Sequence, residues 1–231
     1  MAITAGNVST ETYANSATSY THVHNNNGTV LVVLPMSYID GSTISVSGIT
    51  YNGVAMTHVI DDTSTSVSDH AEIWVLTTPA NGSNNVVVTY NTAPSFGAII
   101  TAVSYTGVDL TTPIGATAQA ASDSQASPVS TSITMASGSV AISGFILGGN
   151  PTVTPGSGQN SRTNADWGGE HYAVTDKGDA TAMSYTYTGG AVRYAHVVAE
   201  LLQAVSVTVP QMQPGLQQLL GSGGMVGRIL R

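Results

Sequence analysis

Residues 49–57 have the sequence ITYNGVAMT, in which an Asn-Gly pair separates two short runs of β-type residues. Asn52 and Gly53 are the residue types that accept the positive φ angles of a type I′ turn, which joins two antiparallel strands through a two-residue loop. We therefore expect a hairpin formed by Ile49–Tyr51 and Val54–Met56. This short segment favours an all-β fold.

Working outward from this hairpin, runs rich in Val, Ile, Thr and Tyr recur along most of the chain. We expect strands near Ser19–His24, Thr29–Leu34, Thr43–Val46, Ile49–Tyr51, Val54–Ile60, Ala71–Thr77, Asn85–Tyr90, Ala98–Tyr105, Ser130–Met135, Val140–Leu147, His171–Val174, Ala180–Tyr187 and Arg193–Leu202. A spacing of roughly 8–12 residues between strands is typical of sandwiches and barrels. The sequence therefore predicts an antiparallel, jelly-roll-like β-sandwich with an extended C-terminal arm.

The chain of 231 residues suits one large all-β domain or two small ones. We expect residues 1–16 to be an N-terminal segment that holds the protein to its neighbours, residues 17–202 the sandwich body and residues 203–231 the arm. The Ala/Ser/Thr-rich stretch 111–128 is a candidate sub-boundary that could link two sheets or two small domains. The Gly/Asn/Pro-rich stretch 148–169 is expected to be a long surface loop.

Composition excludes several classes of protein. Charged residues make up 8% of the chain, against roughly 25% in a typical soluble domain, and the net charge is −8. The five basic residues are not clustered, so neither nucleic acid nor an anionic membrane is an expected partner. The chain has no cysteine and therefore no disulfide or Cys-ligated metal site. A surface with so little charge is difficult to keep soluble as a free monomer, which indicates permanent assembly.

The N-terminal sequence MAITAGNVSTETY has neither a basic n-region nor an apolar h-region, so we do not expect a signal peptide. No apolar run approaches the ~20 residues of a membrane-spanning helix. A chain that looks extracellular but carries no export signal is expected to be assembled in a host cytoplasm and released by lysis. This combination indicates a component of a virus particle.

The C-terminal arm differs in charge from the body. Residues 1–202 carry 3 basic and 13 acidic residues (net −10), whereas residues 203–231 carry 2 basic and no acidic residues (net +2). So short a segment cannot bury its apolar side chains on itself. One interpretation is a frayed terminus, and the other is an arm that docks on an acidic neighbouring subunit. The expected arm anchors are Leu216, Leu219, Leu220, Met225, Arg228, Ile229, Leu230 and Arg231.

No catalytic motif occurs in the sequence, which lacks a Gly-x-Ser-x-Gly elbow, a His-Glu-x-x-His helix and a phosphate-binding Gly-x-x-x-x-Gly-Lys loop. We therefore expect neither an enzyme nor a cofactor. A candidate ligand loop contains Asp166, Trp167, Glu170 and Tyr172, because an aromatic face can stack on a sugar while carboxylates accept its hydroxyl groups. The two acids could also form a glycosidase pair, but two acids in a loop are a weak pattern for catalysis.

Two groups of residues could hold a metal ion. His22 and His24 lie two residues apart and therefore project from one strand face. Asp61, Asp62, Asp69 and His70 flank a Ser/Thr-rich loop and could supply oxygen ligands to Ca²⁺. Histidine pairs on strands are more often solvent-side residues, and the acidic spacing fits no EF-hand loop. We expect no metal.

A series of motifs carries a resemblance to a known module. In order, the chain contains YNGVAMT at 51–57, IWVL at 73–76, NVVVTY at 85–90 and SYTGVD at 104–109. This series resembles a β-sandwich module of phage virion proteins and bacterial surface proteins. The resemblance covers roughly residues 45–115, with a continuation toward residue 202, and does not reach the arm. It implies a structural or adhesive role and brings no catalytic residues.

Taken together, these patterns predict a virion structural protein with no enzymatic activity. The leading expectation is a capsid decoration (cement) protein or head-fibre subunit, homo-oligomeric and bound to capsid or tail subunits through its termini. The first alternative is a tail-associated module that binds a receptor or a host-surface glycan. The second alternative is a jelly-roll major capsid protein.

Overall fold

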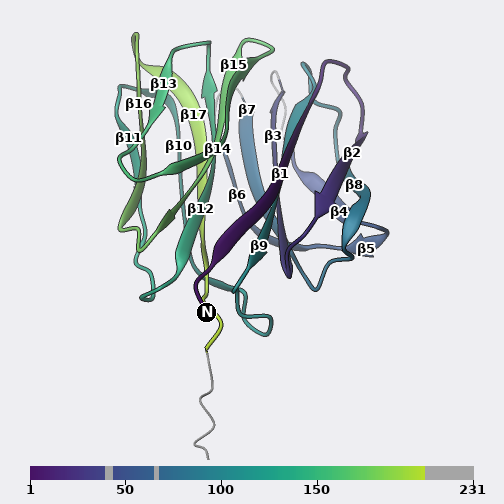
Figure 1. The fold of residues 1–231 in the computed structure, drawn as a ribbon. Coiled ribbons are helices and arrows are strands. Elements are labelled where there is room, and N and C mark those ends of the chain that lie inside the picture. Colours follow the sequence, from purple (N-terminus) through teal and green to yellow (C-terminus); the bar gives the residue numbers. More distant parts are fainter. Residues whose placement is uncertain (40–43, 65–67, 206–231) are drawn as a thin grey trace, which may run out of the picture.

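The computed structural model describes residues 1–39, 44–64 and 68–205, and these residues form β-strands and no helix (Figure 1). The first half contains β1 (Thr4–Tyr13), β2 (Ser19–Asn26), β3 (Val30–Ile39), β4 (Val46–Tyr51), β5 (Val54–Ala55), β6 (Thr57–Thr63), β7 (Ser68–Thr77), β8 (Gly82–Tyr90) and β9 (Ala98–Thr106). The second half contains β10 (Ile114–Gln125), β11 (Val129–Ser132), β12 (Val140–Gly148), β13 (Val153–Pro155), β14 (Asn160–Trp167), β15 (Glu170–Gly178), β16 (Ala182–Tyr187) and β17 (Val192–Leu201).

The strands form four antiparallel sheets, two in each half of the chain. The first half forms the sheets β1-β9-β3-β7-β6 and β2-β8-β4-β5, and the second half forms β10-β17-β12-β15-β14 and β11-β16-β13. Both halves have the same strand order once β5 and β6 are counted as one strand. When the strands of each half are numbered from one to eight, the larger sheet of both halves contains the order 1-8-3-6. This is the order of an eight-stranded jelly roll, so the predicted antiparallel, jelly-roll-like β-sandwich is confirmed.

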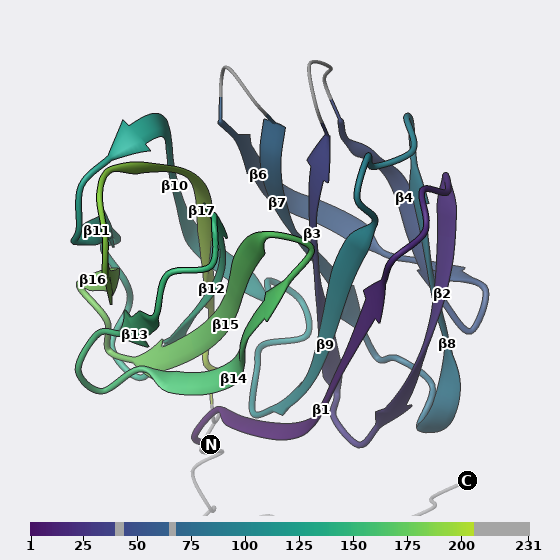
Figure 2. The same ribbon diagram turned by 90° about the horizontal axis from the view of Figure 1, so that it is seen from above.

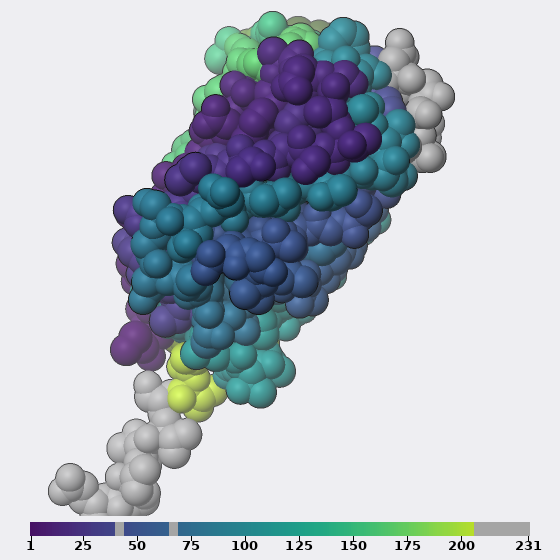
Figure 3. Space-filling view, turned by 90° about the vertical axis from the view of Figure 1, so that its right-hand side faces the viewer, coloured from purple at the N-terminus to yellow at the C-terminus, as the bar shows by residue number. Residues whose placement is uncertain are grey.

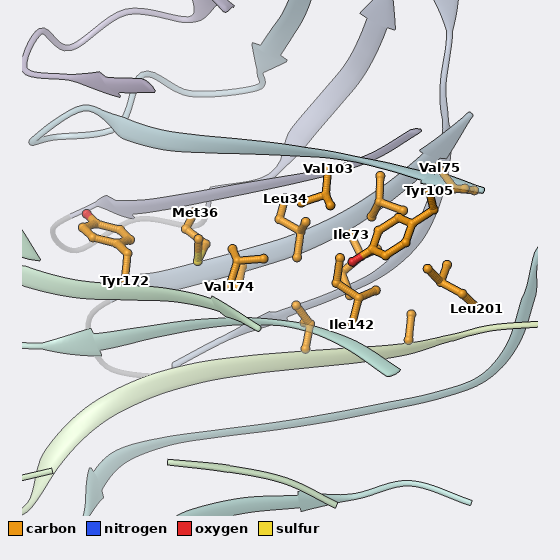
Figure 4. Packing of buried hydrophobic residues seen from close by; sticks show 14 of the residues in the cluster. Leu34, Met36, Ile73, Val75, Val103, Tyr105, Ile142, Tyr172, Val174 and Leu201 are labelled. Atoms are coloured by element: carbon orange, nitrogen blue, oxygen red, sulfur yellow. The ribbon is translucent and has the colours of Figure 1, made fainter. Parts of the chain in front are cut away.

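Viewed from above, the four sheets stack as four layers (Figure 2). The two five-stranded sheets, which we call the middle sheets, pack against each other. Apolar side chains of β3 and β7, such as Leu34 and Ile73, meet those of β12 and β15, such as Ile142 and Val174 (Figure 4). Each middle sheet also packs against an outer sheet on its other face. The central strands of the middle sheets are therefore buried on both faces, which explains why β3, β9 and β12 are nearly continuous apolar runs.

The hairpin that favoured an all-β fold has the expected geometry. Asn52 and Gly53 have φ angles of 50° and 76°, and the register pairs Tyr51 with Val54. Side chains also alternate between the two faces of β7, because Trp74 faces the outer sheet while Ile73 faces the second half. Local turn chemistry and side-chain alternation thus set both the strand pairing and the buried faces.

Four strands, β1, β10, β13 and β14, were not predicted from the sequence. The expected N-terminal segment 1–16 contains β1, which pairs with β9 from Thr4–Thr106 to Tyr13–Ala98, so it belongs to the body's own sheet. The expected link 111–128 contains β10, and the expected loop 148–169 contains β13 and β14. All four lie at sheet edges. An edge strand buries less apolar surface, so its sequence can be as polar as a loop.

The C-terminal arm is described only as far as Val205. All eight expected anchor residues, from Leu216 to Arg231, lie outside the described residues. The predictions made for them are not tested by the fold.

Candidate functional site

The two ends of the described chain meet at one end of the body, which we call the base. Gln203 Nε2 donates a hydrogen bond to the Met1 carbonyl (2.8 Å), and Gln203 forms an isolated β-bridge with Val108. Ala204 N donates to the Gly107 carbonyl (2.9 Å). The last described residues therefore lie beside the N-terminus at one end of an elongated body (Figures 1 and 3).

The opposite end of the body, which we call the tip, includes the β14–β15 turn. Strand β12 runs from base to tip, because Val140 pairs with Leu201 at the base whereas Gly148 pairs with Glu170 at the tip. At about 3.3 Å per residue, the nine residues of β12 separate the two ends by ~30 Å. The last described residues leave the body at the base, so the tip is the part of the body that lies furthest from them.

An aromatic and cationic stack occupies the tip. Phe96 is 50% exposed and stacks on Tyr38, with ring centroids 5.2 Å apart and an interplanar angle of 26°. The Arg193 guanidinium carbon lies 4.8 Å from the centroid of the same Tyr38 ring, which is a cation–π distance. Gly97, with a φ of +91°, lies against Trp167, since a β-carbon at this position would come 2.8 Å from Trp167 Cη2. Phe96 and Trp167 therefore border the same surface.

Beneath this stack, three charged residues connect the two halves of the body. Arg193 of β17 lies 3.1 Å, Nε to Oδ2, from Asp69 of β7 and also pairs through Nη2 with Glu170 of β15. Both carboxylates are buried. One arginine thus serves two buried acids, and removal of the arginine would leave both carboxylates without a cation.

The two carboxylates have strongly raised pKa values. Burial raises the pKa of Asp69 to about 6, although the neighbouring Arg193 opposes the shift. Burial and the nearby Asp69 charge raise the pKa of Glu170 to about 8, again opposed by Arg193. Shifted carboxyl groups often mark functional sites, but structural ion pairs also produce them. This cluster is buried between the halves, so its geometry fits a structural role.

The structure separates the four residues of the predicted ligand loop. Tyr172 is 1% exposed and lies in the core between the middle sheets (Figure 4). Glu170 is buried against Arg193, as described above. Asp166 is half-exposed, and its Oδ1 lies 2.5 Å from His171 Nδ1. Trp167 is half-buried and packs against the core. Only Asp166 and Trp167 therefore border solvent, as the end of a hairpin and not as a long loop.

Sequence reasoning missed Phe96, Tyr38 and Arg193 as members of the tip. Phe96 lies in a Pro-Ser-Phe-Gly stretch that gave no periodic signal, and Arg193 was placed only as the start of a strand. Their proximity to Trp167 depends on how the two halves pack. No sequence pattern within either half predicts how the two halves pack together.

His22 and His24 face the interior, so the expectation that they are solvent-side residues is wrong. Ser9 Oγ lies 2.6 Å from His22 Nε2 and 2.7 Å from His24 Nδ1, and His24 Nε2 lies 2.8 Å from Ser104 Oγ. Burial lowers the pKa of His24 to about 4. The pair is a buried hydrogen-bond chain between β1, β2 and β9.

The acidic residues considered for Ca²⁺ point to different partners. Asp61 lies 3.3 Å from His58 Nε2 at the surface, whereas Asp69 turns toward Arg193. His70 is buried, with Nε2 2.6 Å from Glu72 Oε1. Asp69 and His70 are both buried, although the sequence places them beside a Ser/Thr-rich loop. Within residues 1–39, 44–64 and 68–205, no three His, Cys, Asp or Glu side chains gather as a metal site.

Comparison with protein-family models, with curated proteins and with solved structures gave no match to this chain. In the described part of the chain, no helix long and apolar enough to span a membrane is present. The functional interpretation therefore depends on the geometry of the base and the tip.

Proposed function

We propose that this chain is a non-enzymatic structural protein of a virus particle, of the capsid decoration (cement) or head-fibre type. In this proposal the base faces the particle and residues 203–231 hold it to neighbouring subunits, including further copies of the chain. The observation that carries the proposal is the position of the arm. It leaves the body beside the N-terminus, ~30 Å from the tip by the strand rise, so anchoring the arm leaves the tip free.

The distribution of charge supports a protein that works within an assembly. Of the 13 acidic residues, Asp69, Glu72, Glu170, Asp176 and Glu200 are buried. Two of the five basic residues, Arg162 and Arg193, pair with buried acids. The surface is therefore even poorer in charge than the composition indicates. Such a surface gives little electrostatic protection against association.

Deleting residues 206–231 tests this proposal while leaving every described strand intact. Particles assembled with the shortened chain are expected to contain almost none of it, measured by quantitative gel densitometry of purified particles. A second variant replaces the apolar anchors Leu216, Leu219, Leu220, Met225, Ile229 and Leu230 with Ser. It should be lost equally, because burial of apolar side chains supplies the docking energy.

The matched control replaces the polar residues Gln211, Gln213, Gln217 and Gln218 with Ser and should enter particles like the parent chain. Undiminished incorporation of the shortened chain would contradict the proposal.

A second candidate function is a tail-associated module that binds a receptor or host-surface glycan. The specific observation in its favour is the half-exposed Phe96 beside Trp167 and Asp166 at the tip. An aromatic face stacks on a sugar ring, and an exposed carboxylate accepts its hydroxyl groups. A glycan array with the parent and Phe96→Ala chains tests this function. Binding that disappears in Phe96→Ala but persists in Val23→Ala, a change on the outer sheet, would support it.

The jelly-roll strand order also agrees with a third candidate, a major capsid protein, although a fold alone does not define a function. The two structural roles differ in self-assembly. A major capsid protein should form closed shells when purified alone, whereas a decoration protein should not. Electron microscopy of the purified chain distinguishes them.

A further inference from the structure

An apolar groove opens on the side of the base, between the β6–β7 edge of the first half and the segment that enters β10. Its apolar lining consists of Val59, Val75, Leu76, Leu110, Pro113 and Ile114. The groove has a volume of about 480 Å³. Leu110 is 45% exposed at its rim, which is unusual for a leucine in a chain that buries most of its large apolar side chains.

The groove lies next to the point where the described chain ends. Leu202 N donates to the Pro113 carbonyl (2.9 Å), and Asp109 N donates to the Leu202 carbonyl (2.8 Å). Thr112 lines both this groove and the hollow that contains Val205. Two backbone hydrogen bonds thus attach the segment 109–113, which lines the groove, to the last described residues.

We propose that this groove receives residues Leu216–Leu220 of the arm of a neighbouring copy of the chain. The inference rests on the proposed anchoring role of the arm and names where the arm docks. Leu216, Leu219 and Leu220 have the spacing i, i+3, i+4, which places three leucines on one face of a helical turn. Insertion of such a face into an apolar groove is a common mode of peptide recognition.

Charge at the groove also suits the arm. Asp61 lies 3.3 Å from His58, which lines the groove, and Asp109 is partly exposed at the base. The arm carries Arg228 and Arg231 and no acid. Opposite charges around an apolar contact favour this pairing over docking on a cationic surface.

The length of chain between Val205 and Leu216 lets the arm reach a neighbouring copy. Residues 206–215 include Pro210 and Pro214, each of which disfavours helix at the preceding residue. An extended stretch of this length spans up to ~35 Å. Because the groove shares Thr112 with the hollow at Val205, a spacer of this length can carry the leucines beyond the base to the same groove on an adjacent copy. The charge-poor surface, which favours association, makes that adjacent copy the proposed partner.

Cysteine cross-linking tests this docking directly, because the natural chain contains no cysteine. One full-length chain carries Leu110→Cys, and a second, distinguishable by a mass tag, carries Leu219→Cys. The two are mixed, oxidised and separated on a non-reducing gel. The control replaces Leu110→Cys with Val23→Cys, which is also at an exposed apolar residue, on the outer sheet. A parent-like thermal unfolding curve confirms that each variant folds.

We expect the tagged heterodimer of Leu110→Cys with Leu219→Cys to form at least about tenfold faster than the Val23→Cys control, because docking raises the local thiol concentration. Equal rates for both pairs would overturn the proposal. A further chain carries both Leu110→Cys and Leu219→Cys. If it formed only an intramolecular disulfide, the assignment to a neighbouring copy would be overturned. These results need no virus particle. The cross-link could fail while the chain that lacks residues 206–231 is still lost from particles. That combination would contradict docking in this groove but would leave the anchoring role of the arm supported.

Discussion

Leu34 of β3 packs directly against Gly144 of β12, at the centre of the contact between the middle sheets. A β-carbon added to Gly144 would come 3.2 Å from Leu34 Cδ2 and 3.4 Å from Val197 Cγ2. β3 and β12 are equivalent strands in the two jelly rolls, each the third strand of its half. The absence of a side chain at Gly144 is thus what lets Leu34 approach the second half so closely.

Gly144→Val should destabilise the protein by about 1–3 kcal/mol, because the added methyl groups overpack the contact between the middle sheets. Urea unfolding measures the change. Gly48→Val is the matched control, since a β-carbon at Gly48 meets no atom within 4 Å. Equal stability of the two variants would mean that the middle sheets do not pack as described.

Arg193→Gln should destabilise the protein by about 3 kcal/mol, because removing one partner of a buried ion cluster leaves the other charges uncompensated. Asp69 and Glu170 both lose their cation in this variant. Lys177→Gln is the control, because the Lys177 amine donates to the carbonyl of the exposed Ser157. Chemical unfolding of both variants at the same pH gives the comparison. If Arg193→Gln lost no more stability than Lys177→Gln, the charged cluster would not be what joins the two halves.

Stability should fall as the pH rises from about 5 to 9. The folded-state pKa of Glu170, about 8, lies above its ordinary value of 4.5, so the folded state favours the protonated acid. That contribution is fully present below the ordinary pKa and is lost as the pH rises through about 8. Asp69, with a pKa of about 6, acts in the same direction at lower pH. Glu170→Gln should flatten the profile of urea midpoint against pH, and an unchanged slope would contradict this role.

A separate loss of stability should occur in acid. Burial lowers the pKa of His24 to about 4 and that of His196 to about 3, so the folded state favours neutral imidazoles. This contribution is fully present above the ordinary histidine pKa of 6.5 and is lost as the pH falls toward about 4. His24→Gln should lose less stability than the parent between pH 7 and 4, measured by thermal unfolding. His58→Gln, at an exposed histidine, is the control and should follow the parent.

The central strands were predictable because both of their faces are buried. Runs such as Val30–Leu34 and Ala98–Val103 are almost entirely apolar, so their sequences cannot be mistaken for loops. Four of the edge strands were not predicted, and β10 shows why, because it presents small and polar residues along a half-exposed face. The same ambiguity hid the orientation of His22 and His24, since β2 has polar residues on both of its faces.

The equivalence of the two jelly rolls was also not evident from the sequence. Leu34 and Gly144 occupy the same strand of their halves yet share no chemistry. What the halves have in common is strand order, which many sequences can satisfy. The tip could not be predicted for a related reason. Phe96 and Trp167 come from different halves, and only the packing of the middle sheets brings them together.

The most direct test of the account is a comparison of label access at the two ends of the body in assembled particles. Because the chain has no cysteine, Asp166→Cys at the tip and Leu110→Cys at the base each accept one thiol-reactive label. Both should label in the free chain shortened by deletion of residues 206–231, because its groove has no arm to receive. In particles, the account predicts that the tip cysteine still labels whereas the base cysteine is protected. Equal labelling of both ends in particles, or protection of the tip alone, would contradict it.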